Sequence, residues 1–592
     1  MCGIAGLMTY NGEAPLAAPL RAMGEALRHR GPDGDGQYRS GDVGMVQTRL
    51  AIIDLATGDQ PLYEPGGAAL IANGEIYNYI ELRGELGCGR PTAFSTASDC
   101  ELPLHLYRAH GLDFTAHLRG MYAIALHDPA AGRLILARDP FGIKPLYYAE
   151  TPGAFAFASE PGALIEAGVV TSRLVRSARN ELLQMQFTTG RETIFAGICR
   201  VLPGETVVVR RGRIVERRRR EALVLGGPLP IGEDEALSRL DAALLGSVRI
   251  HQRSDVPFGM FLSGGIDSTA VLAMMARLAE RPVKAFTISF AVSDVADERA
   301  AARAAARAVG AEHVEIILDE ADFWRLLPEV VSAVDDPAAD YAILPTYALA
   351  GAARRAGIKV ILSGEGGDEM FGGYGRYRSA MRPWWAGGRM VRGRGVLDGL
   401  GILRNEIAGW RDGIAAAEAR NGGHARTPLQ VAQAVDCVDW LPNDLLIKLD
   451  RCLMAHSTEG RTPYLDTEVA ALAFTLPDEL KIRHGLGKWL LRRWLAERLP
   501  EAQPFARKRG FTVPVARWIG RRAGELGPLV ARSAAVREIC QPDAVERLFA
   551  AVANKRAGRA AWNLLFYALW HRRHIERAVL PADAVEALAQ TG

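Results

Sequence analysis

The sequence has few cysteines and none in a recognisable arrangement. There are seven in 592 residues, no two form a CxxC pair, and their number is odd. They are scattered at Cys2, Cys88, Cys100, Cys199, Cys437, Cys452 and Cys540. Structural zinc sites usually bring cysteines in closely spaced pairs, and disulfide frameworks usually use an even number. Neither is therefore expected, and the pattern fits a reducing compartment.

The chain also lacks a strong charge, a long apolar run and a leader. Its formal net charge is +3, so no nucleic-acid partner is expected. No apolar run is long enough to span a bilayer, and no basic segment with an apolar core precedes a cleavage site. We expect a cytoplasmic, multidomain protein whose partners include neither a membrane nor a nucleic acid.

Length and local pattern divide the chain in two, because 592 residues are too many for one core. The first part alternates short runs such as MYAIALHD and RLILARD with Gly, Asn and Asp-Pro, which favours strands and turns. A charged, Gly- and Pro-rich stretch, RRRREALVLGGPLPIGEDEA, follows. We predict a first domain over 2–218, a linker over 219–232 and a second domain over 233–592.

The second domain has the pattern of a parallel α/β fold. A helix is predicted in EDEALSRLDAALLGSVRI, where Leu237, Leu240, Leu244 and Val248 recur at helical spacing. VPFGMFL, VKAFTISF and IKVILS are short apolar runs between helical segments, as in a parallel sheet buried on both faces. From Trp489 onward the pattern predicts mainly helices.

The cysteine behind the initiator methionine, in MCGIAGLM, suggests a nucleophile. If Met1 is removed, Cys2 carries both a thiol and a free α-amine. An α-amine titrates near pH ~8, so it can accept the proton of its own side chain. Two residues alone are equally compatible with an incidental cysteine.

The segment FLSGGIDSTAVL predicts a glycine turn between a strand and a helix. Such a turn points backbone N–H groups into one concavity at a helix N-terminus, which favours a polyphosphate. The Walker pattern GxxxxGK[ST] is absent, which excludes the usual P-loop. Asp267 adds a carboxylate where a phosphate-bound Mg²⁺ would need an oxygen ligand. A plain helix cap by Ser or Asp is the alternative.

A second turn of similar build, in IKVILSGEGGDEMFGGY, favours ligand binding. It carries Glu365, Asp368 and Glu369 after another apolar strand. Ligands collect at the carboxyl ends of strands in an open parallel sheet, so the two turns are expected to face each other. We predict that one binds pyrophosphate and the other adenylate, with Asp267 and Asp368 sharing the metal.

The motifs together resemble a known family. SGGIDS resembles the pyrophosphate loop of ATP pyrophosphatases, and MCGIAG, RHRGPDGDG, RLAIIDL, NGEIYN and SDCE resemble class II glutamine amidotransferases. Their order, followed by SGEGGDEMFGGY and EGRTPYLD, is similar to that of bacterial B-type glutamine-hydrolysing asparagine synthetases. The resemblance runs from Cys2 to about Pro514 and is weakest over 378–435. It implies an α/β two-domain protein, in which an N-terminal nucleophile-hydrolase αββα sandwich precedes a parallel-sheet ATP pyrophosphatase domain with a helical C-terminal part.

For the first domain, the resemblance implies hydrolysis of glutamine. Cys2 would attack the side-chain amide, giving a thioester and ammonia. A turn at NGEIYN would supply the oxyanion hole, from the side chain of Asn73 and the backbone N–H of Gly74. A hairpin turn without a catalytic role is the alternative, since Asn-Gly favours one.

Three further residues would bind the glutamine backbone groups. Arg49, in RLAIIDL, would pair with the α-carboxylate through its planar guanidinium. Glu75 and Asp99 are anions that would hold the substrate ammonium group.

For the second domain, the resemblance implies adenylation of aspartate by ATP with Mg²⁺, followed by amidation of aspartyl-AMP. Glu365 would serve intermediate formation and take a proton from the attacking ammonia. Lys508, in FARKRGFTVP, would lie near the phosphates, and an ordinary surface lysine is the alternative. The residues expected to bind ATP or pyrophosphate are Ser263, Gly264, Gly265, Asp267, Ser268, Ile288, Ser363, Gly364 and Asp368. For Ile288, a plain core strand is the alternative.

The acceptor stays open on this basis. GRTPYLD differs from the commoner VRVPFLD, so the alternative is an amidotransferase of the same architecture that acts on another carboxylate. Cys2 argues against a ring-closing relative, and the SGGIDS loop argues against a phosphoribosyl amidotransferase. A regulatory protein with inactive sites is disfavoured, because neither motif set has lost a residue that the chemistry needs.

The remaining basic and aromatic residues have no assigned role. The candidates for contacting phosphate or the acceptor carboxylates are Arg376, Arg378, Lys448, Arg451 and Arg461. Trp384, Trp385 and Trp410 are expected to pack between helices. The expected small-molecule partners are glutamine, aspartate and ATP, and the resemblance implies a homodimer and an ammonia channel.

Overall fold

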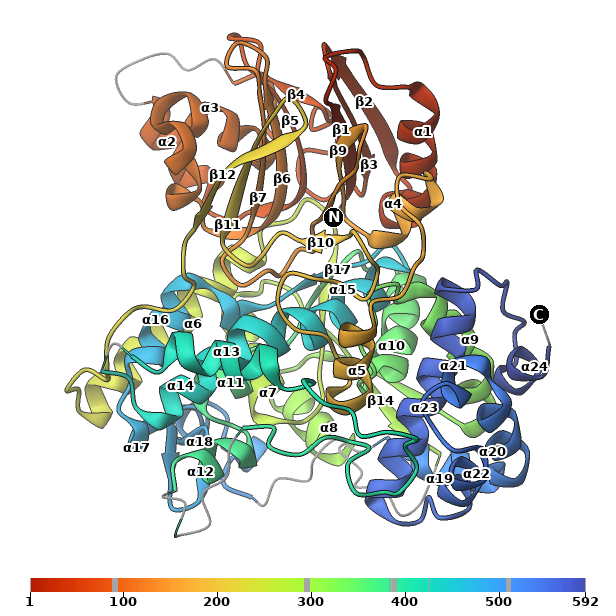
Figure 1. Cartoon of the computed structure of the whole chain (residues 1–592). Coiled ribbons are helices and arrows are strands. Elements are labelled where there is room, and N and C mark those ends of the chain that lie inside the picture. The colour runs from red at the N-terminus through yellow and green to blue at the C-terminus, as the bar shows by residue number, and fades with distance from the viewer. Residues whose placement is uncertain are drawn as a thin grey trace.

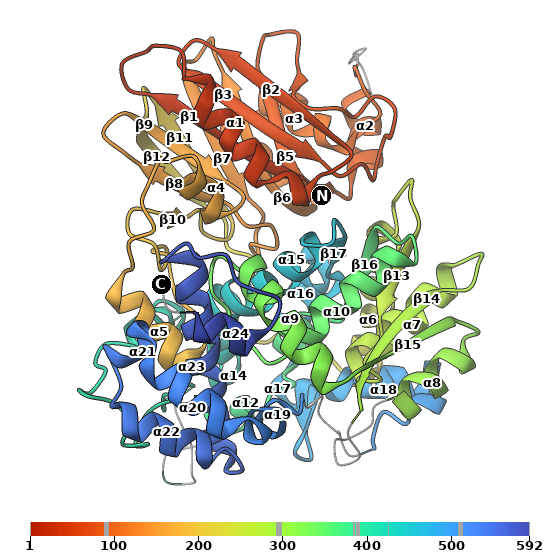
Figure 2. The same cartoon turned by 90° about the vertical axis from the view of Figure 1, so that its right-hand side faces the viewer.

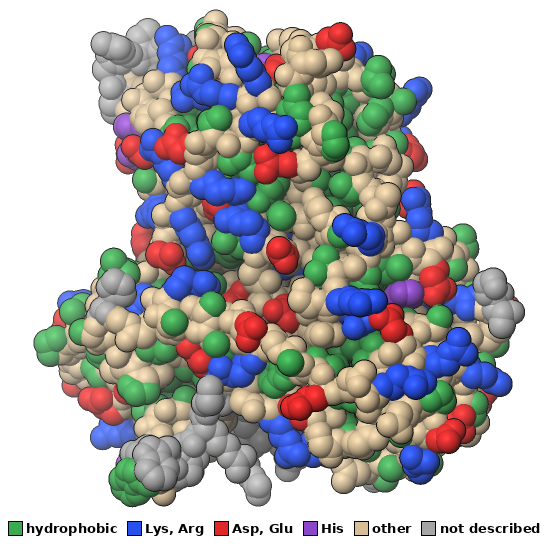
Figure 3. Space-filling view, viewed as in Figure 1, with side chains coloured by type: hydrophobic (Ala, Val, Ile, Leu, Met, Phe, Trp, Pro, Cys, Tyr) green, Lys and Arg blue, Asp and Glu red, His purple; other side chains and the backbone are tan. Residues whose placement is uncertain are grey.

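The computed structural model describes residues 2–87, 94–291, 299–382, 385, 391–423, 425–506 and 513–590. Two parts lie one on the other, with strands dominating the red-to-orange part and helices the green-to-blue part (Figure 1). Both ribbon views put the N-terminus where the two parts meet (Figures 1 and 2). On the face in Figure 3, Lys and Arg are interspersed with Asp and Glu, consistent with the nearly balanced charge. In the described residues, we find no helix with the length and apolarity that crossing a membrane requires.

Two antiparallel six-stranded sheets form the first part. One sheet has the order β10 (Cys199–Arg200), β8 (Tyr147–Glu150), β9 (Ala154–Ala158), β1 (Gly3–Thr9), β3 (Val43–Arg49) and β2 (Gly34–Ser40). The other has the order β12 (Arg213–Arg219), β11 (Glu205–Arg210), β7 (Arg133–Arg138), β6 (Gly120–Asp128), β5 (Ala69–Ile76) and β4 (Leu62–Tyr63).

The sheets pack face to face because side chains alternate along each strand. Ile4 and Met45 from one sheet share a core with Ile71 and Leu136 from the other. The outer faces are covered by helices, namely α1 (Ala17–Ala26) and α4 (Pro161–Glu166) on one sheet, and α2 (Tyr79–Gly87) and α3 (Leu102–His110) on the other. The predicted αββα sandwich is thereby confirmed.

The predicted turn at NGEIYN is wrong for most of its length. Residues Asn73 to Ile76 continue β5 and pair with β6 throughout, and the chain leaves the strand only at Tyr77. Packing outweighs the turn propensity of Asn-Gly here, because β5 is buried on both faces between the opposing sheet and the outer helices.

The second part is built on a parallel sheet, as predicted. Its order is β15 (Glu312–Leu318), β14 (Lys284–Phe290), β13 (Phe258–Phe261), β16 (Val360–Leu362) and β17 (Glu459–Arg461). Ala285 packs with α6 and α7, whereas Phe286 packs with α9 and α10, so helices bury both faces. These helices and α8 span Glu233–His251 (α6), Ile266–Leu278 (α7), Arg299–Ala308 (α8), Glu320–Ala333 (α9) and Ile343–Arg355 (α10).

The rest of the second part is mainly helical. Its helices are α11 (Gly367–Phe371), α12 (Gly375–Ala380), α13 (Asp412–Asn421), α14 (Pro428–Val435), α15 (Leu446–Met454), α16 (Thr467–Thr475), α17 (Asp478–Lys481), α18 (Trp489–Arg498), α19 (Val515–Arg521), α20 (Ala523–Arg532), α21 (Ala534–Arg537), α22 (Pro542–Ala550), α23 (Lys555–His574) and α24 (Ala584–Ala589). A π-helix, Asp436–Leu445, leads directly into α15. A small hairpin of β18 (Ile482–Arg483) and β19 (Leu486–Gly487) precedes α18.

Helix α5 (Arg176–Met185) lies between strands of the sandwich in the sequence but packs against helices of the second part (Figure 1). The side-chain amide of Asn563 on α23 donates to the carbonyl of Leu183 at 2.7 Å. The domain limits stay a prediction, and β12 ends at Arg219 while α6 begins at Glu233.

The three tryptophans of the weakly matching region differ from one another. Trp410 is half-buried against two core clusters, as expected. Trp385 is 74% exposed, so the packing prediction is wrong there, because no core cluster among the described residues includes it. Trp384 lies outside the described residues.

Candidate active sites

Cys2 directly precedes β1 and is buried, with 6% of its surface exposed. Its backbone N–H donates to Oδ1 of Asn73 at 3.1 Å, and its carbonyl accepts from Nε of Arg30 at 3.2 Å. Burial raises the pKa of the Cys2 thiol, while the chain's amino-terminal charge and a hydrogen bond from the Leu50 backbone oppose that rise. The thiol therefore needs a nearby base to react. Met1 lies outside the described residues, and its removal stays a prediction.

Asn73 and Gly74 lie beside Cys2 on β5. Asn73 is fully buried; its Oδ1 holds Cys2, and its Nδ2 has no hydrogen-bond partner among the described residues. A buried amide donor is costly to leave unpaired, so Nδ2 is a natural contact for a substrate oxygen. A Cβ at position 74 would lie 2.1 Å from the carbonyl oxygen of Met121, which only glycine avoids.

Arg49 ends β3 and is 7% exposed. One terminal nitrogen lies 2.6 Å from Oδ1 of Asp59, and the other donates to the carbonyl of Asp54. Its charge also reaches Cys2 and opposes the rise that burial causes in the pKa of the thiol. The guanidinium is thus fixed by its neighbours close to the cysteine, in the domain where glutamine was predicted to bind.

Glu75 and Asp99 are buried acids that influence each other. Oε2 of Glu75 lies 3.3 Å from a terminal nitrogen of Arg461, and Oδ2 of Asp99 accepts from the Ile76 N–H at 2.7 Å. Burial, reinforced by neighbouring carboxylates, holds the pKa of Glu75 well above its usual range. Burial also raises the pKa of Asp99 to about 6. A cationic group brought close to Asp99 would favour its ionised form.

The second part contains a cavity of about 1190 Å³, large enough for a nucleotide. Both glycine turns line it side by side, because β13 and β16 are neighbours whose carboxyl ends meet at one edge of the sheet. All nine predicted nucleotide residues line it, namely Ser263, Gly264, Gly265, Asp267, Ser268, Ile288, Ser363, Gly364 and Asp368. Glu365 lines it as well.

Hydrogen bonds of its two serines fix the conformation of the first glycine turn. The hydroxyls of Ser263 and Ser268 are 3.0 Å apart, and the Gly265 N–H donates to the Ser263 hydroxyl at 3.2 Å. Gly264 has a φ of +70°, which suits glycine. Gly265 is the N-cap of α7 and offers no side-chain cap, so the alternative of a Ser or Asp helix cap does not hold.

Lys488, which sequence reasoning missed, lies between the two predicted metal ligands. Its buried ammonium contacts Oδ2 of Asp267 and lies 2.6 Å from Oδ1 of Asp368. The residue has a left-handed backbone, with φ of +60°, an unusual conformation for lysine. A Cβ at Gly373 would lie 2.3 Å from Cε of Lys488, so this glycine makes room for the lysine. The local sequence GKW gives no signal of these distant contacts.

Lys448 and Glu365 lie beside each other in the wall of the cavity. The Lys448 ammonium lies 2.9 Å from Oδ2 of Asp340 and 3.4 Å from Oε1 of Glu365. Burial raises the pKa of Glu365, and Lys448 opposes that rise. Of the five basic candidates, Lys448 lines the cavity, and the four that do not are Arg376, Arg378, Arg451 and Arg461. Lys508 lies outside the described residues.

Comparison with known proteins matches each part of the chain to a known family. The asparagine synthase family matches residues 239–572, and the glutamine amidotransferase domain family matches residues 1–219. "Asparagine synthetase [glutamine-hydrolyzing] 1" of Bacillus subtilis is 32% identical, over 98% of this chain and 98% of that protein. "Amidase chry2" of Gibberella zeae is 33% identical, over 64% of this chain and 60% of that protein. The chain belongs to the family of glutamine-hydrolysing asparagine synthetases.

Proposed function

We propose that the chain makes asparagine from aspartate, ATP and glutamine at two separate sites. Glutamine is hydrolysed to glutamate and ammonia at Cys2. Aspartate is adenylated in the cavity with release of pyrophosphate, and ammonia then displaces AMP. The observation that carries the proposal is the pair of adjacent glycine turns that line one cavity together with Glu365 and Lys448, in a chain whose first part holds Cys2 against Asn73.

In the first half-reaction, Cys2 is the nucleophile and its own α-amine is the base. After removal of Met1, that amine takes the thiol proton, and the thiolate attacks the side-chain carbonyl carbon of glutamine. Nδ2 of Asn73 and the N–H of Gly74 donate to the oxygen that becomes negatively charged. Because both groups are fixed before substrate arrives, they stabilise that charge without reorganising.

Arg49 and the two acids orient the substrate. Arg49 pairs with the α-carboxylate, and Glu75 and Asp99 hold the ammonium group. Asp99 can do so only when ionised, so its pKa of about 6 sets a limit on glutamine binding.

We therefore expect a pH effect on kcat/KM for glutamine. Below pH about 6, Asp99 becomes protonated and loses its attraction for ammonium, so log(kcat/KM) should fall with a slope about one unit steeper than at higher pH. Asp99→Asn should lower kcat/KM and lack that extra slope. The measurement is glutamate release between pH 5 and 8, and an extra slope that persists in Asp99→Asn would contradict the assignment.

For the second half-reaction, Asp267 and Asp368 would hold the Mg²⁺ that accompanies ATP. The two carboxylates already enclose one cation, the Lys488 ammonium, which supports their fit to a hard cation. In the described residues, no group of three or more His, Cys, Asp or Glu could hold a metal ion. Two carboxylates suffice here, because Mg²⁺ is commonly bound by one or two of them together with substrate phosphates. When bound, the ion neutralises phosphate charge.

The chain's own residues position the reactants. Backbone N–H groups of the turn over Ser263 to Ser268 cradle pyrophosphate at the start of α7. Lys448 draws the aspartate carboxylate toward the α-phosphorus, and Lys488 and Lys508 stabilise the departing pyrophosphate. Glu365 then takes a proton from ammonia as nitrogen attacks the acyl-adenylate.

The acceptor is tested by exchange of labelled pyrophosphate into ATP. Aspartate should support exchange, and a panel of other small carboxylic acids should not. The panel matters because GRTPYLD departs from the commoner motif and because a relative over part of the chain carries the name amidase. Exchange with another acid and none with aspartate would replace asparagine synthesis by amidation of that acid.

A further inference from the structure

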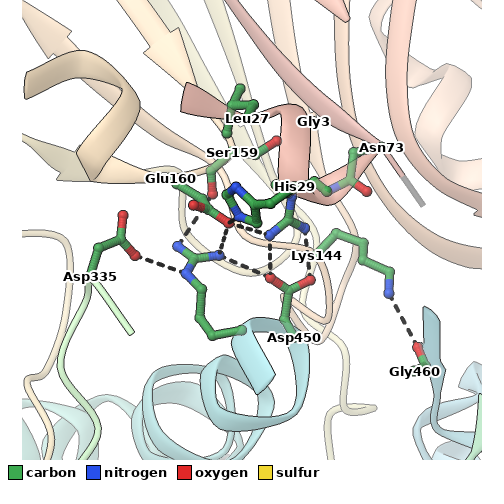
Figure 4. Close-up of polar contacts among 12 residues, drawn as sticks. Gly3, Leu27, His29, Asn73, Lys144, Ser159, Glu160, Asp335, Asp450 and Gly460 are labelled. Carbon is green, nitrogen blue, oxygen red and sulfur yellow. Dashed lines mark hydrogen bonds and ion pairs between the residues drawn. The ribbon is translucent and has the colours of Figure 1, made fainter. Parts of the chain in front are cut away.

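A buried cluster of five charged side chains joins the two parts of the molecule behind Cys2. We call it the interface cluster; its members are Arg30, Glu160, Asp335, Asp450 and Arg451. Glu160, Asp335 and Asp450 are labelled in Figure 4. Each is less than a tenth exposed. Arg30 and Glu160 belong to the sandwich, and the other three belong to the second part.

Arg30 is the member that touches the nucleophile residue. Its Nε donates to the carbonyl of Cys2 at 3.2 Å. One terminal nitrogen donates to Oε1 of Glu160 at 2.6 Å and to Oδ2 of Asp450 at 2.8 Å. The other donates to Oδ1 of Asp450 at 3.0 Å. Both carboxylate oxygens of Asp450 therefore accept from the Arg30 guanidinium, which fixes the plane of the guanidinium.

Arg451 and Asp335 fix Asp450 in turn. Arg451 donates to Oδ2 of Asp450 at 2.9 Å and to Oδ1 of Asp335 at 2.8 Å. The other oxygen of Asp335 accepts the N–H of Gly162 at 2.8 Å, which ties the cluster back to the sandwich. The arrangement is a closed set of contacts rather than one exchangeable pair.

The helix that carries Asp450 also reaches the synthetase cavity. Lys448, two residues earlier on α15, pairs with Asp340 and with Glu365 in the cavity wall. One helix thus contacts the wall of the cavity and, through Arg30, the backbone of Cys2.

Stability alone explains this cluster poorly. Buried ion pairs are often replaceable by well-packed apolar side chains without loss of stability. Burial alone would raise the pKa of the Glu160 carboxyl, but His29, Arg451 and Arg30 outweigh it and hold that pKa well below its usual range. Glu160 therefore stays charged at neutral pH, and an apolar replacement of Arg30 could not donate to the Cys2 carbonyl.

We propose that Asp450 is a positioning residue for glutamine hydrolysis, which orients Arg30 so that Arg30 holds the carbonyl of Cys2 beside the oxyanion donors. A helix of the synthetase part thereby completes the glutaminase site. This inference rests on the proposed role of Cys2 as nucleophile. A displaced nucleophile can cost about 100-fold in rate even when substrate binding is intact.

The test is Asp450→Asn, which keeps the shape but turns an amide N–H₂ toward a guanidinium donor. We expect kcat for glutamine hydrolysis to fall about 10- to 100-fold, with KM for glutamine changed less than about threefold, because Arg49, Glu75 and Asp99 are untouched. Ammonia-dependent asparagine formation should change less than about threefold. If Asp450→Asn does not fold, Arg30→Lys takes its place, because it keeps the positive charge but loses the paired donors of the guanidinium. It should likewise lower kcat for glutamine while KM for glutamine and the ammonia-dependent activity change little.

The matched control is Arg119→Gln. Arg119 also forms a two-pronged ion pair across the interface, at 2.8 and 2.9 Å from Asp466, but no hydrogen bond or ion pair among the described residues joins it to Cys2. It should leave kcat for glutamine within about threefold, even if thermal stability falls as far as in Asp450→Asn.

Four outcomes would overturn the inference. An unchanged kcat for glutamine in Asp450→Asn would contradict the positioning role and leave the proposed function standing. Parallel losses of the glutamine-dependent and ammonia-dependent activities would do the same. An equal loss in Arg119→Gln would assign the effect to general loosening of the interface. If Cys2→Ala still hydrolysed glutamine, the proposed nucleophile would be wrong and the inference would go with it.

Discussion

Replacing Cys2 with alanine is expected to lower glutamine-dependent asparagine formation by about 10⁴-fold or more, because no thioester can form. Ammonia-dependent formation should stay within about twofold of the unaltered chain, since the synthetase cavity is built from residues of the second part. The measurement is asparagine formation with glutamine or with ammonium chloride as the nitrogen donor, together with glutamate release.

Cys100→Ala is the matched control. Cys100 is a second buried thiol at the same site, with Sγ 3.7 Å from the carbonyl of Gly74. Burial holds the pKa of that thiol well above its usual range, so it is a poor nucleophile. Its removal should cost some stability but retain glutamine hydrolysis. Equal losses of both nitrogen donors in Cys2→Ala would contradict the division into two sites.

The starting point of that chemistry can be checked directly. The α-amine of Cys2 can act as a base only after removal of Met1. In the structure, the backbone nitrogen of Cys2 is already held by Oδ1 of Asn73, so a freed amine would begin with a hydrogen-bond partner. Intact mass of the purified, active protein should correspond to a chain starting at Cys2, and a retained methionine would exclude this base.

The sequence could predict that the two glycine turns meet at one cavity because the determinants of that arrangement are local. Each glycine turn directly follows an apolar strand, and β13 and β16 are neighbours in a parallel sheet. Their carboxyl ends must then meet at one edge, and side chains on both turns must converge. Asp267 and Asp368 needed no further information to be assigned to the same site.

Residues whose roles depend on distant partners could not be assigned in this way. In the sequence, Lys488 has the pattern of an ordinary lysine before a helix. Its burial depends on the carboxylates of Asp267, 221 residues earlier, and Asp368, more than one hundred residues earlier. Arg451 and Arg461 were candidates for substrate contacts. In the structure, the carboxylates of Asp335 and Glu459 engage them instead.

Asn73 shows the opposite effect, in which local propensity is overridden. Asn-Gly favours a two-residue hairpin turn, yet Asn73 and Gly74 lie within β5. Pairing with β6 and burial on both faces outweigh that preference, since strand formation is decided largely by neighbours. The assignment of both residues to the oxyanion hole does not depend on the turn, and it stays a prediction.

Replacing Glu365 with glutamine is expected to have the complementary effect to Cys2→Ala. Asparagine formation should fall about 100- to 10,000-fold with either nitrogen donor, while glutamine hydrolysis continues. Burial raises the pKa of Glu365, which makes its carboxylate a stronger base toward ammonia, whereas glutamine cannot accept the proton. Asparagine and glutamate should be measured in the same reaction, where glutamate without asparagine is the expected product pattern.

Glu369→Gln is the matched control for Glu365→Gln. It shows whether the activity loss comes from removing a base or from replacing any buried acid in this segment. Burial raises the pKa of Glu369 to about 8, so its carboxyl is largely protonated at neutral pH, and glutamine reproduces that neutral form. Its Oε1 accepts from the Tyr374 hydroxyl at 2.8 Å, and it does not line the cavity. Glu369→Gln should therefore retain most activity with both donors. If it matched Glu365→Gln, the large loss would reflect distortion of the turn, and proton transfer would have to be assigned to another group in the cavity wall.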